Sequence, residues 1–426
     1  MYMTKLSSIA DYVTDKISSN DIALREYVTT DCILQNKKGR EIATNLPPQS
    51  CCLTRYQHGD VLIANIRPYL KKVWFADIDG GASSDVLVFR VKEGHSPSFL
   101  YAVLLQDSFF DYVMQGAKGS KMPRGDKEQI LRYEMPTLSC SEESIGTFFL
   151  NLDKKIRLNE QINQNLEAMA KQLYDYWFVQ FDFPNEEGKP YKSSGGKMVW
   201  NEKLKREIPS CFNIANMEKL CKFRNGINYS KDETGNDFQI VNVRNISSSK
   251  ILLDGEDFDT ITVPMTKAEN YLLKSEDIII ARSGCPGSTR LLISPTNTLF
   301  CGFIICCTPH NSSMRNYLTY CLKQLEGTNA TTSGGSILQN VSQDTLKGLL
   351  IVVPNKQIID KFNETIELIF TRILNCLKET KALTKQRDEL LPLLMNGQVS
   401  VNSDLSVYKK RRGKVPSSIL NDVSDI

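Results

Sequence analysis

An internal repeat constrains the fold of this 426-residue chain more than any other feature of its sequence. Asp60 and Asp277, which are 217 positions apart, each precede three aliphatic residues and a polar or basic turn. Two Gly/Ser-rich turns, at 116–121 and 332–337, recur at an offset of 216 positions. Each turn is followed by a short helical pattern and then by an apolar strand that ends near a proline. Two matches at nearly the same offset indicate a duplicated domain.

A long helical pattern follows each copy of the repeat. Between Phe149 and Trp177, and again between Phe362 and Leu394, the residues of one face recur at alternating steps of three and four. No glycine interrupts either pattern. This spacing is typical of coiled coils, and at 1.5 Å per residue the first helix would be about 43 Å long. The predicted seam between the helices consists of Leu152, Ile156, Asn159, Asn163, Leu166, Leu173, Ile366, Ile369, Ile373, Leu383 and Leu390.

The two helices are expected to pair with each other, because the chain leaves the first helix, builds the second copy of the domain and returns through the second helix. Asn159 and Asn163 in the seam would fix its register at a cost in stability. An alternative, in which each helix packs only on its own domain, remains open. The predicted fold is mixed α+β, with two similar α/β domains joined by two long antiparallel coiled-coil helices in a pseudo-twofold internal repeat.

The repeat, the helical patterns and a Gly/Pro/Ser-rich stretch after Asp182 divide the chain into six segments. The last segment carries a run of basic residues near 410, which is typical of a solvated tail. The predicted segments are a first domain at 1–140, a central helix at 141–181, a connector at 182–209, a second domain at 210–355, a distal helix at 356–397 and a polar, basic tail at 398–426.

Composition limits the compartment and the metal chemistry that we expect. No apolar run approaches the ~18 residues that a membrane span needs, and the first ten residues lack the apolar core of a secretory signal. We therefore expect a cytoplasmic protein that does not contact a membrane. The chain has 12 cysteines without any C-x-x-C pair, and three histidines. This pattern favours reduced, packed thiols over a zinc site.

The sequence contains no motif that would assign catalysis. The GGK run at 195–197 lacks the upstream glycine of a phosphate-binding loop, because Tyr191 occupies that position. G-x-G-x-x-G, G-x-S-x-G and H-E-x-x-H patterns are absent. The NLPP run at 45–48 resembles the Asn-Pro-Pro-aromatic signature of amino-methyltransferases only superficially, and a turn is the better interpretation. We therefore predict no catalytic residue, metal site or cofactor in this chain.

Basic side chains gather near the predicted turns of both copies, although the formal net charge is only +3. A local basic stripe is sufficient for DNA binding, since arginine can read guanine with two hydrogen bonds and lysine can hold phosphates. For any one of these residues, a solvated surface charge is the alternative. The candidate DNA-binding residues are Arg67, Lys71, Lys72, Lys118, Lys121, Arg124, Arg224, Arg244, Arg282 and Arg290.

Two diverged readers on a rigid helical rod would contact two DNA segments separated by one or more helical turns, each about 34 Å. Because the copies differ in sequence, the two half-sites need not match. The predicted target is therefore an asymmetric, split double-stranded DNA sequence with an unread spacer.

Four blocks of the sequence stand out: NQNLEAMAKQLYDYWFV at 163–179, FDFP at 181–184, GKPYKSSGGKM at 188–198 and RDELLPLLMNG at 387–397. In these blocks the sequence resembles the specificity (S) subunits of type I restriction–modification enzymes. Together with the repeat, these blocks cover nearly the whole chain.

This resemblance implies two target-recognition domains and two spacer helices in a subunit without a catalytic site. It also implies two methyltransferase (modification) subunits that bind the helices and bring S-adenosylmethionine, and restriction subunits that join this core. Apolar residues off the seam are candidates for burial against the partners, with packing on the flanking domains as the alternative. These partner-binding candidates are Phe148, Leu158, Tyr174, Phe178 and Phe370.

Two other functions remain open beside a DNA-specificity subunit. A stand-alone DNA methyltransferase or nuclease is disfavoured by the missing cofactor and metal motifs. A coiled-coil scaffold that never touches DNA is disfavoured by the basic turns that recur in both copies.

Overall fold

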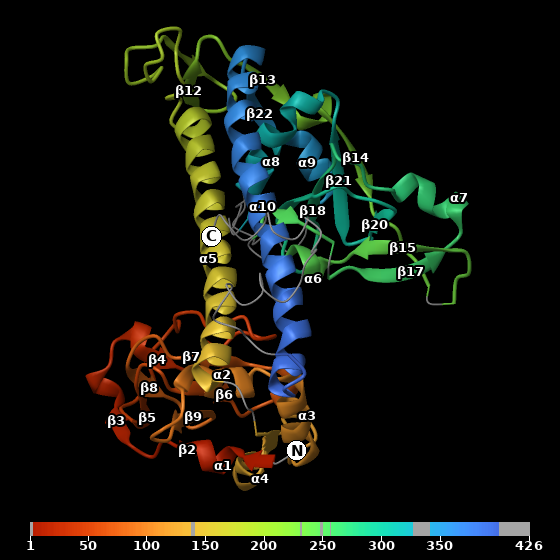
Figure 1. The fold of residues 1–426 in the computed structure, drawn as a ribbon. Coiled ribbons are helices and arrows are strands. Elements are labelled where there is room, and N and C mark those ends of the chain that lie inside the picture. The colour runs from red at the N-terminus through yellow and green to blue at the C-terminus, as the bar shows by residue number, and fades with distance from the viewer. Residues whose placement is uncertain are drawn as a thin grey trace, which may run out of the picture. The chain divides into compact units, whose positions relative to one another are not determined.

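The computed structural model describes residues 3–137, 141–230, 232–247, 250–255, 257–326 and 341–399. The chain divides into two compact units. Unit 1 comprises Met1–Glu160 and Leu377–Ile426, and unit 2 comprises Gln161–Cys376. Both unit boundaries fall inside long helices, α5 (Glu142–Tyr174) and α10 (Lys356–Met395), which Figure 1 draws in yellow and blue. Each unit therefore contains a part of both helices.

The main sheet of unit 1 has four antiparallel strands in the order β2-β9-β6-β7. Its strands are β2 (Ala10–Tyr12), β9 (Val86–Val91), β6 (Val61–Ala64) and β7 (Val73–Phe75). Every residue of β6 and β7 is buried, as expected where a sheet is covered on both faces. A short pair, β1 (Met3–Lys5) with β10 (Glu134–Pro136), joins the beginning of unit 1 to the strand before α5.

Alternate side chains of this main sheet pack into two different layers. Val61, Ile63 and Phe89 face the helical layer, where they share a core with helices α2 and α3 and with the ends of α5 and α10. Leu62 and Trp74 point to the other face and pack against Tyr56 of the second sheet. The helices of the unit are α1 (Leu6–Ile9), α2 (Pro97–Leu104), α3 (Asp107–Gln115) and α4 (Lys127–Leu131).

The second sheet of unit 1 has the order β3-β5-β8-β4. Its strands are β3 (Lys16–Ser18), β5 (Cys52–Tyr56), β8 (Gly80–Ala82) and β4 (Tyr27–Val28), with β4 and β8 parallel. Glycine is required at Gly80, because a Cβ atom there would lie 2.2 Å from the carbonyl oxygen of Glu26. Unit 1 thus has three layers, in which helices, main sheet and second sheet follow one another.

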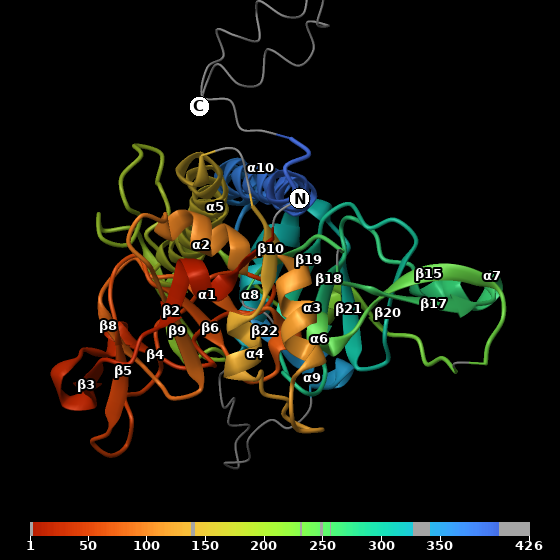
Figure 2. The same cartoon turned by 60° about the horizontal axis from the view of Figure 1, so that its bottom comes forward.

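Unit 2 contains a main sheet with the order β14-β21-β18-β19-β16 and a second sheet with the order β17-β15-β20. In Figures 1 and 2, β15 and β17 lie side by side and lead toward α7. The strands of the sheets are β14 (Cys221–Asn225), β15 (Asn236–Val241), β16 (Leu252–Leu253), β17 (Asp259–Val263), β18 (Ile278–Ala281), β19 (Thr289–Leu292), β20 (Thr298–Phe300) and β21 (Ile304–Pro309). The helices are α6 (Val243–Ile246), α7 (Met265–Ala268), α8 (Arg315–Lys323) and α9 (Gln343–Gly348).

Two strand pairs lie outside the sheets of unit 2. The strand β13 (Asn213–Asn216) pairs with β22 (Leu350–Val353), just as β1 pairs with β10 in unit 1. The hairpin of β11 (Met198–Asn201) and β12 (Arg206–Pro209) follows the end of α5. Among the described residues, no helix is both long enough and apolar enough to cross a membrane.

The two main sheets share their topology. Strands β2, β9, β6 and β7 of unit 1 correspond in order and direction to β14, β21, β18 and β19 of unit 2. The registers align Val61 with Ile278 and Phe89 with Cys307, at offsets of 217 and 218 positions that lie within two positions of those of the sequence repeat. The second sheets differ in their strand order. In unit 1, β8 pairs with β5, whereas in unit 2 the edge strand β17 pairs with β15. The sequence repeat therefore corresponds to the main-sheet scaffold.

Within unit 1, α5 and α10 are joined by buried polar contacts. Arg387 Nη1 lies 3.1 Å from Asp153 Oδ1, and both side chains are about 5% exposed or less. The Tyr101 hydroxyl donates to the other oxygen of Asp153. Asn159 Nδ2 donates to Glu379 Oε2 at 2.8 Å. The predicted seam residues of this unit are buried or half-buried: Leu152, Ile156, Asn159, Leu383 and Leu390.

Within unit 2, the contacts between the helices are aromatic. Phe362 of α10 packs against Tyr174, and against Trp177 and Phe178 in the π-helical turn Asp175–Val179 that ends α5. Asn163 has a buried side-chain oxygen without a hydrogen-bond partner among the described residues. The predicted seam residues of this unit are buried or half-buried: Asn163, Leu166, Leu173, Ile366, Ile369 and Ile373.

Three of the five predicted partner-binding residues face the interior of unit 2. Tyr174, Phe178 and Phe370 are each 4% exposed. Tyr174 stacks on Tyr320, and Phe178 contacts Tyr317, both in α8. Packing on the flanking domain, the alternative interpretation, therefore describes Tyr174 and Phe178, because residues of α8 cover their rings.

Candidate nucleic-acid interface

The two repeated aspartates anchor the turns that enter the central strands β6 and β18. Asp60 accepts the Gln57 N–H at 2.9 Å, and Asp277 accepts the Lys274 N–H at 2.9 Å. Both carboxylates are buried, with 1% and 2% exposure. Since a buried carboxylate needs a charged partner, each is held by an arginine.

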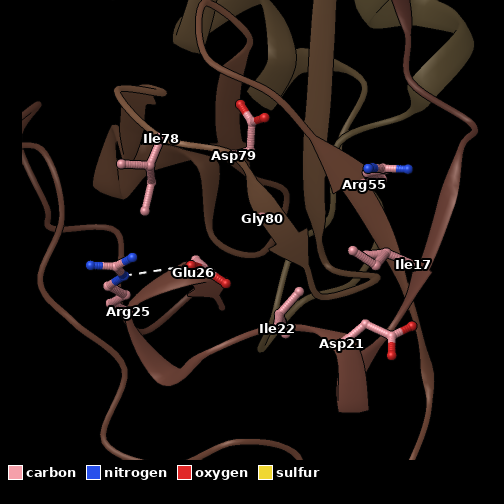
Figure 3. A pocket seen from close by; sticks show the side chains of 9 residues that line it. All are labelled: Ile17, Asp21, Ile22, Arg25, Glu26, Arg55, Ile78, Asp79 and Gly80. Atoms are coloured by element: carbon pink, nitrogen blue, oxygen red, sulfur yellow. Dashed lines mark hydrogen bonds and ion pairs between the residues drawn. The ribbon is translucent and has the colours of Figure 1, made fainter.

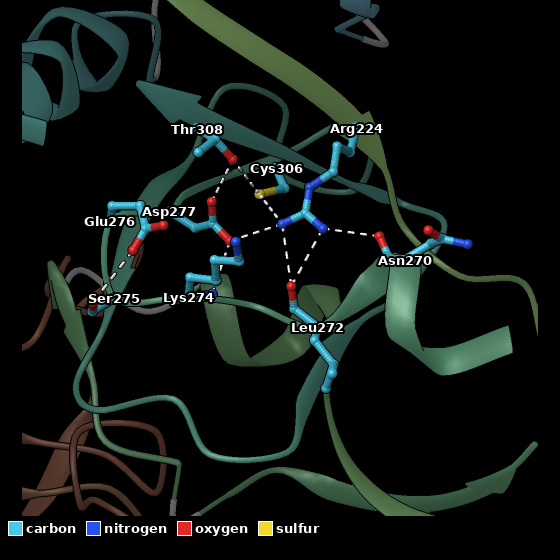
Figure 4. Close-up of polar contacts among 9 residues, drawn as sticks. All are labelled: Arg224, Asn270, Leu272, Lys274, Ser275, Glu276, Asp277, Cys306 and Thr308. Carbon is cyan, nitrogen blue, oxygen red and sulfur yellow. Dashed lines mark hydrogen bonds and ion pairs between the residues drawn. The ribbon is translucent and has the colours of Figure 1, made fainter. Parts of the chain in front are cut away.

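The arginine comes from a different strand in each unit. In unit 1, Arg90 of β9 donates to Asp60 at 2.9 and 2.7 Å. In unit 2, Arg224 of β14 donates to Asp277 at 2.8 Å and to the backbone oxygens of Asn270 and Leu272, as Figure 4 shows. Arg224, a predicted DNA-binding residue, thus has internal partners for both terminal nitrogens.

Three predicted DNA-binding residues of unit 1 are brought together by backbone hydrogen bonds. The Arg67 N–H donates to Pro123 O at 2.8 Å. Lys118 and Arg124 exchange two backbone bonds, each 2.9 Å long. Lys121 lies in the same turn between them. The loop cluster of unit 1, defined as residues 65–72, 83–85 and 117–125, therefore collects the basic residues that are far apart in sequence.

Four basic side chains of this loop cluster are exposed, those of Arg67, Lys118, Lys121 and Arg124. Arg67 and Lys121 form no ion pair with any other residue in the described part of the chain. Lys118 pairs with Asp126 at 2.9 Å, and Arg124 pairs with Asp85 at 3.2 Å. Arg67 and Lys121 can therefore bind an anionic ligand directly. Lys118 and Arg124 are held in surface ion pairs, which contribute little to stability and can be exchanged for a ligand.

Lys71 and Lys72 are more constrained than their neighbours. They follow the 3₁₀ turn Pro68–Leu70, which Arg67 and Lys71 flank with left-handed backbone at φ 52° and 50°. Lys71 Nζ lies 2.8 Å from Asp107, and Lys72 Nζ donates to the Thr30 carbonyl at 2.6 Å. The conformation of the turn therefore rests on contacts outside it.

The structure reveals Lys37 as a support of this turn that no sequence pattern indicated. Its side chain is 6% exposed and lies 2.8 Å from Asp107, which Lys71 also contacts. Its backbone N–H donates to Lys71 O at 3.0 Å. Burial alone would raise the pKa of Asp107, but Lys37 and Lys71 outweigh burial and hold that pKa below its ordinary value. Asp107 is therefore a carboxylate at neutral pH that ties the basic turn to α3.

The predicted residues of unit 2 are less clustered. Arg282 ends β18, is exposed and has no ion-pair partner in the described part of unit 2. Arg244 is exposed and pairs with Asp259. Arg290 is 2% exposed and pairs with Glu326, three residues after the end of α8. The Gly/Ser turn at 332–337 and the tail from 400 lie outside the described residues.

A cavity of about 440 Å³ opens on the second sheet of unit 1. Figure 3 shows that charged side chains surround an apolar floor, with Arg25 and Glu26 paired at 3.4 Å. Its lining consists of Ile17, Asp21, Ile22, Arg25, Glu26, Arg55, Ile78, Asp79 and Gly80. None of these residues belongs to the loop cluster. In the described part of the chain, no group of three or more His, Cys, Asp or Glu side chains could hold a metal ion.

Known proteins resemble this chain over most of its length. The MjaIX specificity subunit, a type I restriction enzyme subunit of Methanocaldococcus jannaschii, is 23% identical over 90% of this chain and 86% of its own length. The HindI specificity subunit of a type I restriction enzyme from Haemophilus influenzae is 25% identical over 92% of this chain and 98% of its own length. No protein-family model matches the chain.

The fold also has a counterpart among solved structures. The crystal structure of the S subunit of a type I restriction–modification system from M. genitalium superposes with a TM-score of 0.57 at 15% sequence identity. The match covers 92% of this chain and 96% of that one. The resemblance that residues 163–198 indicated is confirmed by these matches.

Proposed function

From its similarity to type I specificity subunits along nearly its whole length, we propose that this chain recognises the DNA target of a type I restriction–modification complex. It is a non-catalytic subunit rather than an enzyme in its own right. That full-length similarity is the observation that carries the proposal. The shared main-sheet scaffold of the two units supports the proposal, because a two-part DNA target requires two DNA-recognition domains.

Unit 1 would contact DNA through its loop cluster. Arg67, Lys118, Lys121 and Arg124 are exposed and lie on loops joined by backbone hydrogen bonds. Basic side chains bind phosphates independently of sequence, whereas arginine can also read a guanine edge. In unit 2, Arg282 and Arg244 are the exposed candidates, while the internal pairs of Arg224 and Arg290 assign these two to the scaffold.

The target would be asymmetric and bipartite. The units share the strands of the main sheet but differ in their second sheets and in the side chains at their loops. Two readers on a common scaffold with different side chains would read two different half-sites. The spacer between the half-sites would be set by α5 and α10, for which we propose antiparallel pairing, supported by the Asp153–Arg387 and Asn159–Glu379 contacts in unit 1.

Two methyltransferase subunits, which bring S-adenosylmethionine, and the restriction subunits would supply the chemistry. Leu158 on α5 is 49% exposed and remains a candidate for contact with a methyltransferase subunit. Phe148 is half-buried against the core of unit 1 and offers only part of its ring. Action on genomic DNA would take place in the cytoplasm.

Methylation-sensitive sequencing of the host genome with and without the gene tests this function. We expect one split adenine-methylation motif to disappear on deletion and to return on complementation. Purified chain incubated alone with DNA and S-adenosylmethionine serves as a second arm, in which no methylation is expected. An unchanged set of motifs after deletion, or methylation by the isolated chain, would contradict the proposal.

A further inference from the structure

The turn before β9 in unit 1 and the turn before β21 in unit 2 are built in the same way. The Asn65 N–H donates to Asp85 O at 2.8 Å, and the Arg282 N–H donates to Phe303 O at 2.8 Å. The offsets between these residues are 217 and 218 positions, within one or two positions of the offsets of the sequence repeat. Asn65 and Arg282 follow the last residues of β6 and β18, and Asp85 and Phe303 precede β9 and β21.

Two more backbone bonds recur at this place. The carbonyl oxygen of Asn65 accepts the Gly125 N–H at 3.3 Å, and that of Arg282 accepts the Val341 N–H at 2.9 Å. The turn itself is closed by a bond from Val86 N to Ser83 O at 3.0 Å in unit 1, and from Ile304 N to Cys301 O at 2.9 Å in unit 2. The backbone geometry is therefore common to the two units.

The side chains on this common backbone differ in chemistry. Asp85 is a half-buried carboxylate paired with Arg124 at 3.2 Å. Its counterpart Phe303 is a phenyl ring that is 62% exposed. Asn65 is 8% exposed, whereas its counterpart Arg282 is exposed and free of ion pairs with the described residues. The backbone is therefore the same in both units, whereas a half-buried carboxylate is replaced by an exposed ring and a buried amide by an exposed arginine.

Packing within the protein does not explain why the ring of Phe303 is exposed. Burying a large apolar side chain is favourable, but this ring is 62% exposed. The neighbouring Arg282, whose backbone N–H donates to the Phe303 carbonyl oxygen, forms no ion pair with the described residues. An exposed aromatic residue and a neighbouring arginine offer the two kinds of contact, apolar and hydrogen-bonding, that adjacent DNA bases can accept. The ring can contact a thymine methyl or stack, and the guanidinium can donate to guanine.

We propose, on the premise of the function proposed above, that Asp85 with Arg124 in unit 1 and Phe303 with Arg282 in unit 2 are the specificity-determining side chains. Each pair reads base edges in one half of the split target. In unit 1, Arg124 donates to guanine while Asp85 accepts from the amino group of cytosine, and in unit 2 Arg282 and Phe303 recognise guanine and a neighbouring thymine methyl.

The test uses the full chain assembled with its methyltransferase subunits. Competition binding compares DNA duplexes that carry the intact target with duplexes that carry one base-pair substitution in one half. Variants Phe303→Ala and Arg282→Ala should lower discrimination at one or two base pairs of one half-site by roughly 10- to 100-fold. Asp85→Ala should do the same in the other half. Met265→Ala, which removes another exposed apolar side chain of unit 2, serves as the control and should leave discrimination unchanged.

Each outcome decides the proposal. Loss of discrimination confined to one half supports it. Unchanged discrimination, a change in both halves, or an equal loss of affinity on every duplex would overturn it, because a phosphate contact or a folding defect acts on all sequences alike. If the unaltered complex discriminates no sequence at all, the proposed function fails instead, so the two failures are distinguishable.

Discussion

At the scale of the residue, both units have a buried aspartate at the equivalent position, but the arginine that pairs with it comes from a different strand in each unit. Asp60 is neutralised by Arg90 of β9, whereas Asp277 is neutralised by Arg224 of β14. The strand registers place Thr308 at the position of Arg90, and the Thr308 hydroxyl donates to Asp277. A buried carboxylate thus requires a cationic partner in both units, but the arginine that serves as this partner lies on a different strand in each unit.

This exchange of strands predicts a rescue. Arg224→Val should lower the free energy of unfolding by about 3 kcal/mol, because it leaves the buried carboxylate of Asp277 without its cation. Adding Thr308→Arg should recover at least half of the loss, since it restores the arrangement of unit 1. Urea denaturation of the three proteins measures both effects. Arg282→Ala, a surface change, should stay within about 0.5 kcal/mol. A double variant no more stable than the single one would contradict this account.

A second residue-scale prediction concerns Glu326, the partner of Arg290. Burial alone would raise the pKa of Glu326, but Lys323 and Arg290 outweigh burial and hold it below its ordinary value. A carboxylate with a lowered folded-state pKa stabilises the protein above its unfolded pKa, and this contribution is lost as pH falls through the folded pKa. Glu326→Gln should therefore cost about 2 kcal/mol near neutral pH and progressively less in acid.

Unfolding free energies of the Glu326→Gln variant and the unaltered chain, measured across pH, check this dependence. The matched control is Asp344→Asn, since the Asp344 side chain is 93% exposed and its one ion-pair partner among the described residues is Lys347, at 3.7 Å. Its effect should be close to zero at all pH values. A Glu326→Gln deficit that grows in acid would show that the sign is wrong.

The sequence could identify the repeated aspartates but not the roles of the arginines around them. Asp60 and Asp277 stand in similar local sequences, so the repeat reveals them. No local sequence pattern around Arg224, Arg282 or Arg290 indicates a carboxylate partner, and only the fold distinguishes a buried ion pair from an exposed side chain. Phe303 and Lys37 were missed for the same reason, since exposure of the first and burial of the second are properties of tertiary packing.

At the scale of the element, the two long helices are the most predictable part of the chain. Their steps of three and four residues specify a helix without knowledge of the rest, and the structure contains helices at Glu142–Tyr174 and Lys356–Met395. The short strands were less predictable. Strands such as β4 and β16 have two residues each, and strands buried on both faces lack the apolar–polar alternation that marks a strand.

The buried ion pair between α5 and α10 in unit 1 gives an element-scale prediction. Arg387→Met should destabilise the protein by about 3 kcal/mol, because the carboxylate of Asp153 would remain buried without a cation. Replacing both residues, as in Asp153→Leu with Arg387→Met, should cost less than the single change. Thermal and urea unfolding measure the effect. Lys385→Met, at a position 75% exposed on the same helix, is the control, and an equal loss for both single variants would contradict the assignment.

At the scale of the whole molecule, the proposal is that two units of shared scaffold read separate DNA segments and that the paired helices set the distance between those segments. This proposal agrees with the position of Arg67, Lys118, Lys121 and Arg124, which are exposed on the loop cluster of unit 1. It also makes half-site identity and spacer length separable properties, the first belonging to loops and the second to helices.

Inserting one heptad into both α5 and α10 tests this separation most directly. Seven helical residues add about 10 Å, which corresponds to roughly 3 base pairs of DNA at 3.4 Å each. Sequencing of the methylated motif in cells that carry the lengthened protein gives the result. We predict unchanged half-sites with a spacer longer by about 3 base pairs. Altered half-site bases, or the original spacer length, would contradict the account.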